Sequence, residues 1–144
     1  MRIYTIGFTK TSAQHFFERL QEVQARSLSD VRLNNKSQLA GFAKREDLSY
    51  FLDAILGIGY RELPILAPTR ELLSKYRSHV FSWEQYASEY LALLRERQPE
   101  KHLQPNDLMN TCFLCSEPTA DRCHRRLAAE FLASAWQDVS IEHL

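Results

Sequence analysis

The feature that most constrains the fold of this chain is an alternation between short apolar segments and stretches with helical periodicity. Strand character is concentrated in five segments, at residues 3–6, 27–31, 60–63, 111–115 and 139–144. Because strands that alternate with helices build parallel sheets covered on both faces, we predict an α/β fold. The expected sheet is mostly parallel, with about five strands flanked by helices in a Rossmann-like three-layer arrangement. Its strand order stays open.

Helix starts are indicated by capping boxes, in which a Ser or Thr and a Gln three residues later satisfy each other's backbone donors. Thr11 with Gln14 predicts the start of a first helix, and Ser82 with Gln85 predicts the start of a longer one. The second box lies inside a helical segment expected at about 69–98. The remaining expectations are helices at residues 46–56 and 125–136 and a surface loop at residues 99–105.

Length and charge limit the classes of protein to which the chain belongs. Its 144 residues fit one domain, expected to span residues 1–144. Lys and Arg number 18, as do Asp and Glu, so no overall charge attracts the chain to nucleic acid or to a membrane. The first residues become polar too early for a signal peptide, and no apolar run approaches the roughly 20 residues of a membrane span. We therefore expect a cytoplasmic protein without membrane contact.

Polar side chains gather where two of the predicted strands end. Asp30 and Arg32 are two residues apart at one end, and Cys115 and Glu117 have the same spacing at another. Side chains with this spacing on an extended chain point to the same side. Ligands of open α/β sheets bind at the carboxyl ends of the strands. We therefore predict a functional site with these four residues, and an ion-pair network without a catalytic role is the alternative.

Side chains that can take part in catalysis are most closely spaced in the segment that follows Cys115. Cys123, His124 and Arg125 are expected in the first turn of the last helix. A thiol beside cations at a helix amino terminus favours the thiolate form, so Cys115 and Cys123 are both candidate nucleophiles. Cys112 is assigned to the core.

Two cysteine chemistries can be compared with the observed spacing. A cysteine-based phosphatase loop has an arginine six residues after its thiol, but that position after Cys115 is Asp121, and Arg122 follows it. A thioredoxin-type pair needs two thiols separated by two residues, which only Cys112 and Cys115 provide. Those two residues should face opposite sides of the predicted strand. The spacing therefore argues against both chemistries.

A metal site is a further alternative, because Cys112, Cys115, Cys123 and His124 carry ligand types that zinc prefers. The opposite orientation expected of the first two argues against a site with all four. A zinc-stabilised domain is kept as a minor alternative, and no other cofactor motif is identified. A reversible disulfide between Cys115 and Cys123 also stays open.

Four motifs, spread along essentially the whole chain, resemble one family. They are Tyr4-Thr5-Ile6-Gly7, Asp30-Val31-Arg32, Leu114-Cys115-Ser116-Glu117 and Cys123-His124-Arg125-Arg126. In this order they are similar to the signatures of the domain-of-unknown-function 488 (DUF488) proteins. The resemblance implies a bacterial or archaeal, cytosolic α/β domain and brings no established reaction with it. Where that family commonly has a histidine after the glycine, this chain has Phe8, which removes one candidate catalytic imidazole.

These residues lead us to expect an enzyme that acts on a nucleotide-like or other anionic, phosphate-bearing substrate. Guanidinium groups bind phosphate bidentately, and a carboxylate beside them can act as general base or nucleophile. The expected catalytic residues are Asp30, Cys115, Glu117, Cys123 and His124, and the expected substrate-binding residues are Gly7, Thr9, Arg32 and Arg125.

The alternative from a different functional class is a non-catalytic binding or regulatory module that holds a nucleotide, a nucleic acid or a partner at the same cationic edge. Acids and thiols are poor choices for a site that only binds anions, which favours the enzyme. A cationic stretch with Lys36, Lys44 and Arg45 could contact a nucleic acid backbone, but the zero net charge disfavours this partner.

Overall fold

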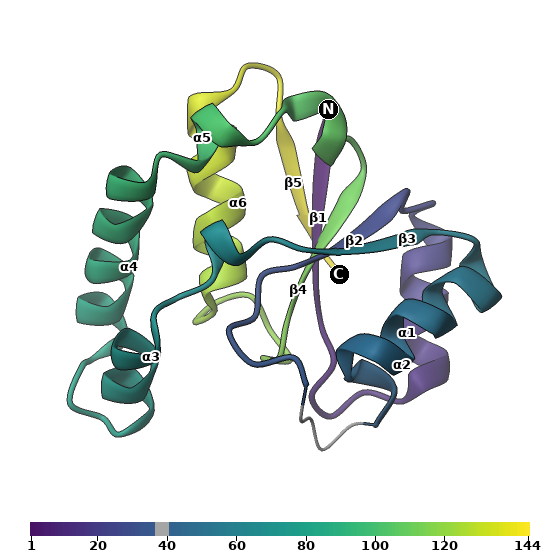
Figure 1. The fold of residues 1–144 in the computed structure, drawn as a ribbon, viewed down its shortest axis with the longest axis horizontal. Helices are drawn as coiled ribbons and strands as arrows, with labels where there is room; N and C mark the ends of the chain where they lie inside the picture. Colours follow the sequence, from purple (N-terminus) through teal and green to yellow (C-terminus); the bar gives the residue numbers. More distant parts are fainter. Residues whose placement is uncertain (37–40) are drawn as a thin grey trace.

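The computed structural model describes residues 1–36 and 41–144, which contain one five-stranded sheet (Figure 1). All neighbouring strands are parallel, in the order β3-β2-β4-β1-β5. The predicted α/β fold with a parallel sheet is therefore confirmed. The strands are β1 (Arg2–Gly7), β2 (Ser27–Asp30), β3 (Gly59–Glu62), β4 (Thr111–Cys115) and β5 (Ser140–His143).

Helices cover both faces of the sheet (Figure 1). One face carries α1 (Ala13–Glu22) and α2 (Arg45–Phe51), and the other carries α6 (His124–Ala135). Two further helices, α3 (Arg70–Arg77) and α4 (Trp83–Arg97), pack outside α6 and extend this layer. Within the described residues, no helix is both long enough and apolar enough to cross a membrane.

The side chains of β4 alternate between two buried clusters. Cys112 and Leu114 pack with residues of α1, whereas Phe113 and Cys115 pack with residues of α4 and α6. This alternation is the strand periodicity of two. Cys112 and Cys115 therefore face opposite sides of the sheet, as predicted, and the core of the protein has two halves.

The predicted capping box at Thr11 is wrong by one residue. Ser12 is the N-cap of α1, and its hydroxyl accepts from the backbone N–H of His15 at 3.2 Å. The N–H of Thr11 instead donates to the carbonyl of Phe8 in the preceding turn, so the helix begins one position later. The second capping box, at Ser82, is confirmed.

The surface loop expected at residues 99–105 is also wrong, because this segment is largely helical. It contains the one-turn helix α5 (Pro99–His102) and leads into a 3₁₀ turn at Pro105–Leu108. Each turn starts with a proline, whose fixed φ suits the first helical position. These two prolines therefore begin helical turns instead of bounding a loop.

The parallel register brings the carboxyl ends of three strands to one edge of the sheet. Gly7 at the end of β1 is paired with Cys115 at the end of β4, and Asp30 at the end of β2 is paired with Leu114. The loops that follow these strands therefore leave the sheet close together. Ligand crevices of parallel sheets lie outside such an edge.

Candidate active site

A cavity of about 550 Å³ lies at this carboxyl edge. Its walls come from the residues after β2, from α3 and α4, from the loop after β4 and from the start of α6. Of the predicted site residues, the described lining includes Arg32, Cys115, Glu117, Cys123 and His124, and it does not include Gly7, Thr9, Asp30 or Arg125.

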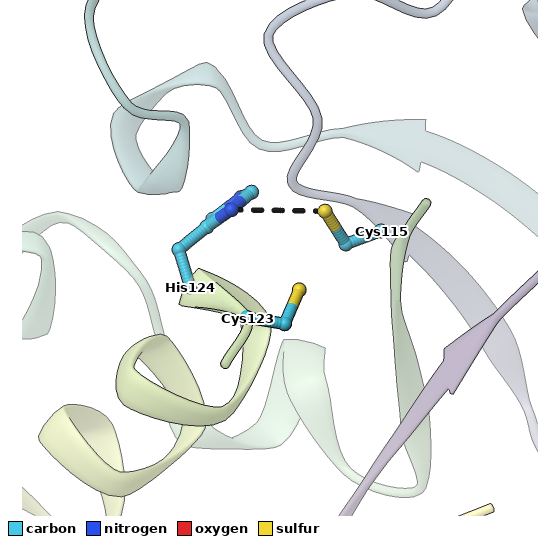
Figure 2. Close-up of side chains that lie close together, drawn as sticks. All are labelled: Cys115, Cys123 and His124. Carbon is cyan, nitrogen blue, oxygen red and sulfur yellow. Dashed lines mark hydrogen bonds between the residues drawn. The ribbon is translucent and has the colours of Figure 1, made fainter. Parts of the chain in front are cut away.

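Cys115 and His124 are in contact in this lining (Figure 2). The Sγ atom of Cys115 lies 3.6 Å from Nδ1 of His124, and both side chains are buried. The other ring nitrogen, Nε2, lies 2.7 Å from the carbonyl oxygen of Val31. Because a carbonyl only accepts, Nε2 donates its proton there, and in the neutral ring Nδ1 is left to accept from the Cys115 thiol. A thiol beside a base oriented by a third group is the arrangement of an activated nucleophile.

Cys123 lies beside Cys115 and His124 and completes a cluster of three side chains (Figure 2). It is the N-cap residue of α6 rather than part of its first turn, and 3% of it is exposed. A hydrogen bond from the Cys123 thiol is the main effect that lowers the pKa of Cys115, and the backbone N–H of Ser116 acts in the same direction. The same hydrogen bond between the two thiols, together with burial, raises the pKa of Cys123. The pair therefore ionises first at Cys115.

Arg125 is fully buried and supports the loop that follows β4. Its Nη1 donates to the backbone carbonyl of Glu117 at 2.7 Å. Among the described residues, no carboxylate forms an ion pair with Arg125. A buried cation without such a partner is stabilised by a nearby anion, and its charge contributes to the lowered pKa of Cys115.

Gly7 and Thr9 supply backbone contacts that hold the loop after β1 against the loop after β4. A Cβ atom on Gly7 would overlap the carbonyl oxygen of Glu117. The N–H of Thr9 donates to the carbonyl of Ser116 at 3.1 Å. Only glycine permits this close approach of two backbones, so the position of the residues after Cys115 depends on Gly7.

Asp30 and Arg32 satisfy each other in a buried ion pair beside the cavity. Nε and Nη2 of Arg32 donate to the two carboxylate oxygens of Asp30 at 2.9 and 2.7 Å. The hydroxyl of Tyr60 donates to the same carboxylate at 2.6 Å, and Nη1 of Arg32 donates to the carbonyl of Ala43 at 2.8 Å. Exposure of the two side chains is 3% for Arg32 and 0% for Asp30. The charge that Arg32 brings to the lining is therefore neutralised by Asp30.

Three further cationic side chains line the cavity, together with one acidic side chain, Glu117. The cations are Lys36, Arg77 and Arg122. In residues 1–36 and 41–144, none of these four side chains takes part in an ion pair. The cavity therefore has an excess of positive charge, which attracts anions.

The predicted site residues did not include Arg77 and Arg122. Arg122 stands one position too late for the phosphatase spacing, yet it reaches the same cavity as Cys115. Arg77 ends α3, and no sequence signal places that helix at the edge of the sheet. Only the folded structure shows that these two arginines line the cavity.

A comparison with protein families matches residues 12–132 to a family described as Domain of unknown function DUF488. The chain belongs to the DUF488 family. This match confirms the resemblance that the sequence motifs indicated. A comparison with curated proteins found no match, and a comparison with solved structures found none.

In this DUF488 protein, the residue after Gly7 packs against the buried ion pair. Phe8 is 4% exposed, and the guanidinium carbon of Arg32 lies 5.3 Å from the centre of its ring. Position 8 therefore supplies a cation–π contact and no imidazole. The imidazole beside Cys115 comes instead from His124, which is far from position 8 in the sequence.

The same DUF488 chain packs a column of aromatic rings against His124. The ring of Tyr90 meets the imidazole edge-on at 5.4 Å, and its hydroxyl donates to the carbonyl of Leu66 at 2.6 Å. Tyr90 stacks on Tyr86, which stacks on Tyr76 at 4.7 Å. Tyr76 and Tyr86 also line the cavity, so the column both fixes His124 and provides an aromatic wall.

Proposed function

We propose that this DUF488 protein is an enzyme in which Cys115 attacks a small anionic, phosphate-bearing substrate, nucleotide-like substrates included. The observation that carries the proposal is the 3.6 Å contact between Cys115 and His124 in the lining of a cationic cavity. A thiol with an oriented base serves nucleophilic catalysis, whereas cations serve anion binding. Their coincidence in one cavity favours a reaction over binding alone.

The proposed reaction has two steps. His124 accepts the proton of Cys115, the sulfur attacks the electrophilic atom of the substrate, and a bond between sulfur and that atom forms. The bond to the leaving group breaks, and the leaving group takes the proton from the imidazolium. In the second step His124 removes a proton from water, the resulting hydroxide attacks the adduct, and the sulfur leaves as thiolate beside the imidazolium.

The anion-holding role goes to Arg77, Arg122 and Lys36, whose charges are not neutralised by a described carboxylate. Arg32 also lines the cavity, but Asp30 neutralises its charge. It therefore offers hydrogen-bond donors to a ligand and adds little to the electrostatic attraction of an anion. Glu117 is the acid that reaches the cavity and can orient the attacking water. Asp30 and Arg125 are assigned positioning roles, because each holds a neighbouring group of the site.

The aromatic wall supports the nucleotide-like part of the proposal. Tyr76 and Tyr86 line the cavity that also holds the cations. Aromatic side chains bind the flat faces of bases, and arginines bind phosphates. A nucleoside monophosphate combines both features in one small ligand.

Turnover and covalent trapping test this proposal. The purified protein is incubated with nucleoside monophosphates, sugar phosphates and p-nitrophenyl phosphate, and quenched samples are analysed for a mass adduct on Cys115. We expect turnover by the wild type and by Cys112→Ser, whose thiol lies on the other face of the sheet, and none by Cys115→Ser. If no substrate in the panel gives turnover or an adduct, the proposal is contradicted. Thermal shifts without turnover would support the binding module instead.

A further inference from the structure

We propose that Cys115, Cys123 and His124 together form a binding site for a zinc ion, with one coordination position open to the cavity. The two sulfur atoms and a ring nitrogen lie within 4.8 Å of one another, and all three residues are buried. This inference goes beyond the proposed function. Only the effect of the ion on the reactivity of Cys115 rests on that function.

The distances suit a tetrahedral ion. With Zn–S and Zn–N bonds of about 2.3 and 2.0 Å, the sulfur–nitrogen edge of a tetrahedron is about 3.5 Å long, and the sulfur–sulfur edge is about 3.8 Å. The observed separation of Cys115 Sγ from His124 Nδ1 is 3.6 Å. Small rotations of the side chains therefore suffice to bring three ligand atoms to bonding distance of one ion.

A hydrogen bond also holds the ring of His124 in the orientation that a zinc ligand needs. Zinc-bound histidines usually donate their other ring N–H to a carbonyl or a carboxylate, which fixes the ring and its tautomer. His124 makes this contact through Nε2 to the carbonyl oxygen of Val31 at 2.7 Å. Nδ1, the nitrogen that faces the thiols, is then the one that is free to coordinate.

Charge and access favour zinc with an open position. Two thiolates balance the two charges of the ion, and sulfur and imidazole ligands select zinc over harder cations such as magnesium. All three residues line the cavity, so water or an anionic ligand can reach the fourth position. Cys112 lies on the other face of the sheet, so the site has three protein ligands instead of the four considered from the sequence.

A bound ion would hold Cys115 in an unreactive form. Coordination withdraws negative charge from the sulfur and occupies Nδ1 of His124, the atom that would otherwise accept the proton of Cys115, so zinc-bound Cys115 is a much poorer nucleophile. Release of the ion restores the thiol and the base. Zinc is thus proposed as a reversible inhibitor of the same site.

Metal titration of the full chain tests this inference. The reduced protein is freed of metal with a chelator and titrated with Co²⁺, and Zn²⁺ is then added in competition with a chromophoric chelator. We expect one equivalent of metal and the intense absorption of tetrahedral, thiolate-bound Co²⁺, which Zn²⁺ abolishes. Absence of stoichiometric binding, or a Co²⁺ spectrum without thiolate charge transfer, overturns the proposal.

Two matched variants locate the ligands. Cys123→Ser keeps a hydroxyl that donates a hydrogen bond to Cys115 but removes a soft ligand. It should weaken zinc binding by roughly 100-fold or more, because loss of a group that merely hydrogen-bonds to a metal ligand already costs about 10–100-fold. Cys112→Ser should bind zinc as the wild type does, and equal weakening by both variants overturns the proposal.

Alkylation of Cys115 by iodoacetamide separates this inference from the proposed function. Rapid labelling of the metal-free protein, with protection by one equivalent of zinc, supports the site and its inhibitory role. Zinc binding to a protein whose metal-free Cys115 is inert supports the metal site and contradicts the nucleophile. A reactive Cys115 in a protein that does not bind zinc does the reverse.

Discussion

The Nε2 atom of His124 lies 2.7 Å from the carbonyl oxygen of Val31, so the chain just beyond β2 orients a side chain at the start of α6. Val31 is itself fixed, because its N–H donates to the carbonyl of Leu114 on β4 at 3.2 Å. This backbone contact does for His124 what a carboxylate does for the histidine of a catalytic triad. Because the acceptor is a backbone atom, no side-chain substitution at position 31 removes it.

Replacement of His124 is expected to slow any reaction of Cys115 at neutral pH. His124→Asn removes the proton acceptor at Nδ1, and loss of a general base typically costs about 100-fold or more in turnover. The measurement is the iodoacetamide labelling rate of Cys115 and, with a substrate in hand, kcat. His143→Asn is the matched control, because His143 does not line the cavity. Equal rates in the wild type and His124→Asn would exclude the proposed base.

The pH profile of Cys115 alkylation is expected to lie below that of an ordinary thiol, whose pKa is about 8.5. The hydrogen bond from Cys123 lowers the pKa of Cys115, so its thiolate persists at a pH where a free thiol is protonated. The rate should fall only as the pH drops through this lowered pKa. Labelling rates of the metal-free protein, measured from about pH 5 to 9 against free cysteine, check the shift. Cys123→Ala should move the profile upward, and an unchanged profile in that variant would assign the shift to another cause.

Loss of one partner from the buried Asp30–Arg32 pair is expected to destabilise the fold strongly. Arg32→Ala leaves the Asp30 carboxylate buried without its cation, which costs about 3–5 kcal/mol in the free energy of unfolding. Arg2→Ala is the control, because Arg2 forms an exposed pair with Glu142 that contributes about 0–1 kcal/mol. Denaturant unfolding of both variants measures the difference. If the two variants lose comparable amounts of unfolding free energy, the buried pair contributes no more to stability than an exposed one.

Substitution of Gly7 is expected to disturb the site and the fold together. The Cβ of Gly7→Ala would overlap the carbonyl of Glu117, so the loop after β4 must shift, at a cost of about 1–3 kcal/mol. Gly59→Ala, in β3, is a matched control because its added Cβ meets no atom within 4 Å. Unfolding and Cys115 labelling are measured for both. Wild-type behaviour of Gly7→Ala would show that the two backbones can separate freely.

Hydrophobic periodicity was sufficient to predict the fold class. Strands buried on both faces have short apolar runs in the sequence, whereas helices have apolar residues at helical spacing. Every predicted strand is present. The strand order was not predictable, because hydrogen bonds such as those between β2 and β4 join segments about which local sequence carries no information. The capping error at Thr11 has a different, local origin, since a turn closed by Phe8 takes up its N–H group.

The candidate site was predictable as a location more than as a set of contacts. Cys115, Cys123 and His124 lie near one another in sequence, and the strand-to-helix connection brings them together. Arg125 follows His124 by one helical position, about 100° around the helix axis, so it points into the core instead of the cavity. Arg77 and Tyr76 reach the site only because α3 packs against α4 and lines the cavity.

The most direct test of the account compares the labelling of Cys115 by iodoacetate with that by iodoacetamide at neutral pH. The anionic reagent should gain from Arg77 and Arg122, so the iodoacetate-to-iodoacetamide rate ratio should exceed that of free cysteine by roughly tenfold, a modest electrostatic enhancement. The double variant Arg77→Ala/Arg122→Ala should lose this excess, whereas Arg2→Ala/Arg26→Ala, with the same change in charge outside the cavity, should keep it.

Peptide mass spectrometry locates the label in each case. The account predicts that Cys115 is modified first and carries the raised iodoacetate-to-iodoacetamide ratio. Preferential labelling of Cys112, or a ratio at Cys115 no higher than that of free cysteine, would contradict a reactive thiol in an anion-binding cavity.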